Sequence, residues 1–361
     1  MTVATAQPAP VGRLAAPAGE KVWCVETLSS LCSVDTTSGR EARLLPHLER
    51  ILVELGAELT IQTVTSGRIN VLARWGRPRV LLTTHLDTVA PFLPPRRAED
   101  ALYGRGACDA KGQIVAQLAA ICRHLESGSS DIAWLAVAGE ETDGAGAAAA
   151  LELAPHLPEL EAVIGGEPTE NRLATSQAGF LHLTLRCSGR RGHGAVGRPG
   201  ESALWHLHDW LGAIRSRPER EHPVFGRESF NLGMIRGGEG ANVVAGEATA
   251  DLVVRTVPDS DFVEVCRALA PEGSEVIVRL DEPPSRLSSW PGLDDGPVGF
   301  GSDVPRLSAL APSGRAFLLG PGSIRFAHRD DEHLRWDELG EGIDLLTGLV
   351  RELLGTTGGA S

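Results

Sequence analysis

The sequence predicts an α/β protein whose central, mostly parallel sheet is interrupted by an inserted ferredoxin-like α+β domain. In the first half of the chain, short apolar runs alternate with helix-like stretches, as in β-α-β units around a buried sheet. In the middle, polar and apolar residues alternate, which is typical of half-exposed strands. Near the C-terminus an apolar strand and a long helical pattern return. A chain of 361 residues is long enough for two domains.

The first part of the main domain is expected over residues 21–175, after an Ala- and Pro-rich start (1–20) that we interpret as a flexible arm. Helical spacing of apolar residues predicts two helices before the first strand. Helices then alternate with buried strands. The expected helices are 21–32, 41–56, 112–126 and 144–154, and the expected strands are 69–74, 79–84, 132–138 and 161–165.

The inserted domain is expected over residues 176–285, because this stretch holds a complete β-α-β-β-α-β order. About a hundred residues suffice for an independent domain. The main domain then resumes over 286–361. The expected elements of the insertion are strand 180–187, helix 201–215, strands 229–236 and 246–256, helix 259–270 and strand 275–280; strand 315–320 and helix 337–354 follow in the main domain.

Composition excludes several classes of function. The formal net charge of −13 argues against a nucleic-acid partner. No stretch of about 18 apolar residues occurs, so we expect no membrane span. The six cysteines are scattered and form no CxxC pair, which predicts reduced thiols. Together with a start that lacks a signal-peptide pattern, this predicts a cytoplasmic protein.

Chemically active side chains follow the predicted strands. His85 and Asp87 come after strand 79–84 and share a face in an extended segment, so His85 could bind a metal while Asp87 orients its ring. A simple hydrogen-bonded pair at a strand end is the alternative. Asp109 lies in the Gly-rich loop GRGACDAKG before a helix, where it could equally be an N-cap. This loop does not match the phosphate-binding GxxxxGK[ST] pattern.

Acidic residues follow two further strands. Glu140 and Glu141 end a run that is too apolar to lie at the surface, and two such charges need a cation or a proton to compensate them. An exposed acidic turn is the alternative. Glu167 follows strand 161–165 and could instead be a capped loop carboxylate. His328 follows the last strand; an ordinary surface histidine is its alternative, and His333 competes with it for the same role.

The joint pattern is more specific than any one motif. Open α/β sheets bind ligands at the carboxyl ends of their strands, where all these residues fall. Two histidines and several carboxylates suit two Zn²⁺ or similar ions. One further carboxylate beside the ligands could act as a general base.

The ordered motifs HLDTV, GRGACDAKG, GEET, GEPT and AHRDDEH resemble those of the dinuclear zinc amidohydrolases. This family includes acetylornithine deacetylase, succinyl-diaminopimelate desuccinylase, aminoacylase and the glutamate carboxypeptidases. The resemblance runs from about residue 21 to the C-terminus. It implies a zinc-exopeptidase-like catalytic domain, and it implies that the insertion is a lid and dimerisation domain.

The resemblance also implies roles for the individual residues. Two Zn²⁺ ions, for which Co²⁺ can substitute, would share one carboxylate. Glu140 would be the general base, and Asp87 would hold His85. The implied metal ligands are Asp109 as the bridge, His85 and Glu167 for one ion, and Glu141 and His328 for the other.

Three lid segments resemble segments of the family that act on the substrate. SGRRGHGA implies that His193 stabilises the oxyanion, and GGEGANVV and DLVVRTVP imply that Asn242 and Arg255 bind substrate. A turn histidine, a turn asparagine and a solvated strand arginine are the alternatives. Because relatives dimerise through this domain, we expect a homodimer in which His193 reaches the metals of the neighbouring chain.

The implied function is metal-dependent removal of an acyl group from an N-acyl amino acid, first of all N-acetylornithine in arginine biosynthesis. Acetylcitrulline deacetylase, succinyl-diaminopimelate desuccinylase and dipeptidase are alternatives within the family. A metal-binding protein without catalysis is a further alternative, against which Glu140 argues. The chain departs from common family patterns at Ala110 and at Gln177–Gly179, which puts the substrate rather than the metal site in doubt.

Overall fold

The structure is a computed structural model that describes residues 17–198 and 201–355. The described residues divide into two compact units: 17–175, 287–296 and 302–355 form the first, and 176–198, 201–286 and 297–301 form the second. The divisions lie beside the boundaries expected at 176 and 286. Residues 297–301 are an exception: they were expected in the main domain but belong to the second unit, where the Ala178 N–H donates to the Val298 carbonyl (3.2 Å).

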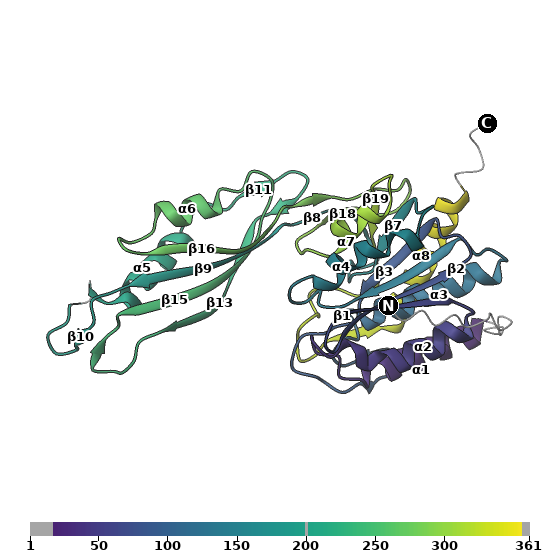
Figure 1. The fold of residues 1–361 in the computed structure, drawn as a ribbon, viewed down its shortest axis with the longest axis horizontal. Coiled ribbons are helices and arrows are strands. Elements are labelled where there is room, and N and C mark those ends of the chain that lie inside the picture. Colours follow the sequence, from purple (N-terminus) through teal and green to yellow (C-terminus); the bar gives the residue numbers. More distant parts are fainter. Residues whose placement is uncertain (1–16, 199–200, 356–361) are drawn as a thin grey trace. The chain divides into compact units, whose positions relative to one another are not determined.

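The first unit is built on a six-stranded mixed sheet (Figure 1). Its four strands β6, β3, β7 and β19 are parallel, and β1 and β2 are antiparallel at one edge. In sheet order the strands are β1 (Glu58–Thr65), β2 (Arg68–Trp75), β6 (Ile132–Val137), β3 (Val80–His85), β7 (Ala162–Gly165) and β19 (Arg315–Leu318). A fold with parallel strands at its centre and helices on both faces needs strands that are apolar on both sides, as β3 and β6 are.

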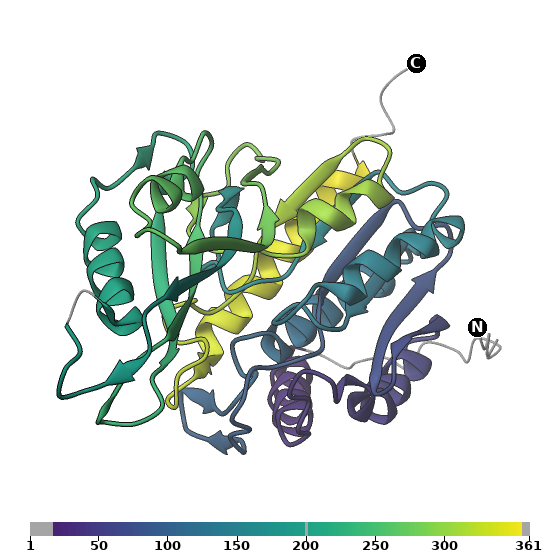
Figure 2. The ribbon, with the colours of Figure 1, turned by 60° about the vertical axis from the view of Figure 1, so that its left-hand side comes forward.

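Two apolar cores cover the two faces of this sheet. Along β3, Val80 and Leu82 belong to one core and Leu81 to the other, because successive side chains of a strand point to opposite faces. The larger core contains residues of α1 (Pro17–Cys32), α2 (Leu45–Glu54), α3 (Lys111–Glu126) and α8 (Trp336–Gly355). The smaller core contains residues of α4 (Ala145–Ala150) and α7 (Val304–Leu307). Figure 2 shows α3 and α8 running along the sheet.

A small three-stranded sheet completes the first unit: β4 (Arg96–Arg97), β5 (Ala101–Tyr103) and β20 (His333–Arg335). A second small sheet joins β17 (Ser285–Arg286), β8 (Leu173–Gln177) and β18 (Asp295–Val298), the segments at which the chain passes between the units.

The second unit, which we call the lid, has a four-stranded antiparallel sheet in the order β13-β15-β9-β16. With α5 after the first strand and α6 before the last, this is the ferredoxin-like order that the sequence predicts. Both helices bury apolar side chains against one core of the sheet (Figure 1). The elements are β9 (Phe180–Ser188), α5 (Ala203–Arg215), β13 (Ser229–Gly237), β15 (Glu247–Arg255), α6 (Phe262–Ala268) and β16 (Glu275–Glu282), with the short pairs β10 (Gly192–His193) and β14 (Val243–Val244), and β11 (Glu221–His222) and β12 (Gly226–Arg227).

The structure corrects some expected elements. The first helix begins at Pro17, so the end of the expected 1–20 arm is helical; residues 1–16 lie outside the described part. The expected helix 41–56 is a 3-10 turn followed by α2. Strand β1 was not predicted. All six cysteines are buried and free, and no helix within the described residues is long and apolar enough to cross a membrane.

Candidate metal centre

The sheet of the first unit brings the predicted residues to one edge. His85 is the last residue of β3, Glu140 and Glu141 follow β6, and Glu167 follows β7. Because these three strands are parallel neighbours, their carboxyl ends meet. Asp109 precedes α3 in the loop that follows β5. Residues far apart in the sequence thus become neighbours at this edge.

One group of potential ligands consists of His85, Asp109 and Glu167, all buried. One ligand atom from each of them lies within 4.8 Å of the others. The Nε2 atom of His85 is 2.9 Å from Oδ1 of Asp109 and 4.0 Å from Oε1 of Glu167. The three side chains could therefore hold a single metal ion.

A second group consists of Asp109, Glu141 and His328. The Nε2 atom of His328 is 2.8 Å from Oε1 of Glu141 and 3.4 Å from Oδ2 of Asp109. The two oxygens of Asp109 therefore face different histidines. This arrangement allows Asp109 to bridge two ions. His328 adopts φ 66°, which is uncommon for a residue other than glycine and is typical of functional positions.

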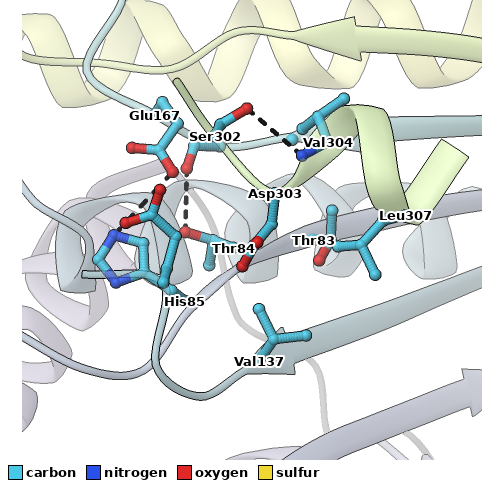
Figure 3. A pocket seen from close by; sticks show the side chains of 12 residues that line it. Thr83, Thr84, His85, Val137, Glu167, Ser302, Asp303, Val304 and Leu307 are labelled. Carbon is cyan, nitrogen blue, oxygen red and sulfur yellow. Dashed lines mark hydrogen bonds and ion pairs between the residues drawn. The ribbon is translucent and has the colours of Figure 1, made fainter. Parts of the chain in front are cut away.

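Glu140 lies beside both groups. It forms a third possible group with His85 and Glu141, and with His85 and Glu167 it lines a pocket. Figure 3 shows His85, Glu167 and Asp303 around this pocket. Asp303 and its neighbour Ser302 come from the segment before α7, and sequence reasoning missed them. Their only sequence signal is the glycine-containing GSD at the start of a helix.

The crowding of buried acids at this edge shifts the pKa values of the residues there. Burial, reinforced by the charge of Glu167, raises the pKa of Glu140 well above its usual value. Burial also raises the pKa of Glu167, and His85 only partly opposes it. The hydrogen bonds to Asp109 and Glu141 raise the pKa of His328 to about 10. A bound cation would compensate the carboxylate charges that burial disfavours at this edge.

The donor set fits divalent metal ions. Two imidazole nitrogens and several carboxylate oxygens are ligands that Zn²⁺ accepts, and Co²⁺ accepts the same donors. Burying so many carboxylates without a compensating charge is costly. His333, the competing histidine, instead lies in β20 against Tyr103 and Phe326, with ring centroids 4.9 Å and 4.2 Å away.

Asp87 differs in detail from its expected role. The Nδ1 atom of His85 lies 2.9 Å from the backbone carbonyl oxygen of Asp87 and 3.6 Å from its carboxylate. The buried carboxylate accepts backbone N–H bonds from Gly139 (2.9 Å), Glu140 (3.1 Å) and Glu141 (3.2 Å), and the Ser38 hydroxyl donates to it at 2.8 Å. Asp87 thus fixes both the ring of His85 and the turn that carries the two glutamates.

The lid residues lie at two ends of the lid sheet. His193 is exposed in β10, and the N–H of the next residue donates to the carbonyl of Asn242 at 2.6 Å. β15 begins close to this end, where Glu247 pairs with Ser188. Arg255 ends β15 at the opposite end, with its guanidinium over the Phe180 ring (4.9 Å). Nine extended residues span roughly 27 Å, so Arg255 is remote from His193 and Asn242.

Comparison with known proteins agrees with this geometry. Residues 81–352 match the family described as Peptidase family M20/M25/M40. A Peptidase M20 domain-containing protein of Schizosaccharomyces pombe is 32% identical over 343 residues, covering 91% of this chain and 84% of that protein. A probable carboxypeptidase of Aspergillus clavatus is 32% identical over 372 residues, covering 91% and 82%.

The fold recurs in solved structures. A tripeptidase of Staphylococcus aureus superposes with a TM-score of 0.74 at 18% identity, covering 92% of this chain and 98% of that one. The mixed sheet, the inserted lid and the two groups of potential ligands thus occur in a chain whose sequence matches the family over most of its length. The chain belongs to peptidase family M20/M25/M40 and is a hydrolase that acts on amide bonds.

Proposed function

We propose that this protein is a two-metal hydrolase that cleaves the amide bond next to the carboxyl-terminal residue of a short peptide or an N-acyl amino acid. The observation that carries the proposal is the pair of ligand groups that share Asp109 and leave Glu140 unassigned. His85, Asp109 and Glu167 would hold one Zn²⁺, and Asp109, Glu141 and His328 would hold the other.

The residues divide the chemistry among them. Bound Zn²⁺ or Co²⁺ would polarise the amide carbonyl and lower the pKa of water. Glu140 would take a proton from the attacking water and pass it to the leaving amine. Burial, reinforced by the charge of Glu167, raises the pKa of Glu140, which makes this carboxylate a stronger base than an exposed glutamate. His193 would donate to the developing oxyanion.

Arg255 and the names of the related proteins both support a substrate class. Arg255 is a fork-shaped donor that can bind a free α-carboxylate at two points. Relatives at about a third identity are named probable carboxypeptidases, an activity that acts beside a free carboxylate. Peptides are therefore our first candidate substrates. N-acetylornithine, favoured by the motifs HLDTV, GEET and GEPT, is the second.

A homodimer through the lid is part of this proposal. His193 and Asn242 lie at one end of the lid sheet. Arg255 lies at the other end, over the ring of Phe180, where the chain enters and leaves the lid. In one chain these residues are too far apart to hold one small substrate. A partner chain that donates His193 and Asn242 resolves this difficulty.

The lid also offers a surface for such a partner. β13 is an edge strand of the lid sheet, and an unpaired edge can pair with another chain. Large apolar side chains are exposed on β13 and on α5: Leu204, Trp205, Leu232, Met234 and Ile235. Two copies could bury them together.

A substrate panel tests the proposed activity. Dipeptides, tripeptides and N-acetylated amino acids, each with a free or an amidated carboxyl end, are incubated with the Zn²⁺- or Co²⁺-loaded protein. We expect cleavage of free-carboxylate compounds and little cleavage of their amides. Equal turnover of both forms would exclude an activity directed by the carboxylate. Exclusive turnover of N-acetylornithine would favour the second candidate.

A further inference from the structure

A buried ion pair lies behind the candidate metal centre, outside its ligand set. Arg105 is 1% exposed and Glu332 is fully buried, and Nη1 of Arg105 is 2.5 Å from Oε2 of Glu332. Burying two opposite charges is costly before their mutual attraction is counted. Arg105 stands four residues before Asp109, and Glu332 stands four residues after His328.

The second oxygen of Glu332 holds the loop that leads to Asp109. Oε1 accepts backbone N–H bonds from Gly106 (2.9 Å), Cys108 (3.2 Å) and Asp109 itself (3.2 Å). The backbone carbonyl of Glu332 accepts another from Gly104 (2.9 Å). One residue of the His328 segment therefore satisfies four donors of the Asp109 loop.

Arg105, from the Asp109 loop, in turn binds the backbone of the His328 segment. Its Nη1 also donates to the carbonyl of Arg329, the residue after His328, at 3.2 Å. Its Nε donates to the carbonyl of Pro91 at 3.2 Å. The guanidinium thus belongs to the Asp109 loop but binds the backbone beside His328.

We propose that Glu332 and Arg105 are positioning residues that fix the shared carboxylate of Asp109 relative to His328 before any metal binds. The proposal rests on the metal centre described under the proposed function. Asp87 does the same for the turn of Glu140 and Glu141, also by accepting three backbone N–H bonds. The Glu140–Glu141 turn and the Asp109 loop thus each have a buried carboxylate that binds their backbone, Asp87 for the turn and Glu332 for the loop.

A matched control exists in the lid. Arg217, which is partly buried, pairs with the buried Glu228 (2.5 Å). In the described part of the chain, neither belongs to a group of potential metal ligands. Loss of either carboxylate charge leaves an arginine without its ionic partner, so both variants should be less stable than the wild type. Only Glu332 should also change metal binding.

The first test compares Glu332→Gln with Glu228→Gln in the full-length protein. Zn²⁺ affinity is measured by competition with a chelator, and ligand geometry by the visible absorption of the Co²⁺-loaded protein. We expect Glu332→Gln to weaken Zn²⁺ binding about 10- to 100-fold, as partners that orient ligands do, and to change the Co²⁺ spectrum. Glu228→Gln should keep both at wild-type values. A folded Glu332→Gln protein with wild-type affinity and spectrum would overturn the proposal.

A second test needs no variant and therefore does not depend on folding of the mutants. Amide hydrogen exchange is measured on the metal-free wild-type protein. The N–H groups of Gly106, Cys108 and Asp109 should be protected, because Glu332 holds them without metal. Exchange at the rate of an open loop would overturn the proposal. Wild-type protein that binds neither Zn²⁺ nor Co²⁺ would instead overturn the metal centre itself, so the two failures are distinguishable.

Discussion

The two units of this chain present their candidate functional residues in opposite ways. In the first unit, His85, Asp109 and Glu167 are buried and contact one another through imidazole and carboxylate atoms. In the lid, His193 is exposed in β10 and Asn242 is exposed in the turn before β14. The buried cluster of charges in the first unit is assembled entirely from residues of that unit. We expect exposed polar residues such as these two to act only when another protein surface or a substrate contacts them.

Metal removal should break the first unit's function completely. Exhaustive chelation should abolish hydrolysis, and Zn²⁺ or Co²⁺ should restore it, because the polarising charge is gone while the ligands remain. The rate of hydrolysis of the peptide that is cleaved best in the substrate panel is measured, and metal content is determined by elemental analysis. Full turnover by protein shown to be free of metal would refute the two-metal mechanism.

Glu140→Gln should separate chemistry from metal binding within the same cluster. Glutamine keeps the size of the side chain but cannot accept a proton, so kcat should fall at least about 100-fold. Metal content should stay near that of the wild type.

Asp109→Ala is the matched control for Glu140→Gln, because it removes the carboxylate shared by both ligand groups and should lose metal. If Glu140→Gln loses metal while the loaded fraction turns over normally, Glu140 is a ligand and Glu141 is the candidate base.

Arg255→Ala should affect the lid's contribution to binding. Loss of a charge-assisted hydrogen bond of about 1.5–3 kcal/mol corresponds to a roughly 10- to 150-fold rise in KM for substrates with a free carboxylate. The matching amides should change little. Arg236→Ala is a suitable control, because Arg236 lies on β13 and pairs with Asp251 (3.2 Å). Equal effects of Arg255→Ala on acids and amides would remove this role.

Mixing two inactive variants tests whether the lid serves the partner chain. His193→Ala and Glu140→Gln proteins are unfolded and refolded together. Half of the dimers should be mixed, each with one intact site of two, so about a quarter of wild-type activity should return. Subunit exchange is verified with differently tagged chains. Exchange without recovered activity would show that His193 acts in its own chain or has no role.

Much of the first unit could be predicted from the sequence. The apolar runs 79–84 and 132–138 locate β3 and β6. The acids and the histidine at the ends of these strands cannot serve as apolar core residues, so they indicate a chemical role. The edge strand β1 was missed, because its alternating ELTIQTVT pattern is more polar than the neighbouring apolar runs. The order of the lid elements was predictable because each is bounded by turns and has its own period.

The sequence by itself determined which residues could carry chemistry, since strand ends and Gly-rich loops are local features of the chain. Tertiary structure decided how they are held. Asp87 binds the Glu140–Glu141 turn, and Glu332 binds the Asp109 loop more than two hundred residues away. Asp303 reaches the pocket beside His85 only through the folded chain. Backbone donors look the same in every residue, so no sequence pattern reveals which distant carboxylate will satisfy them.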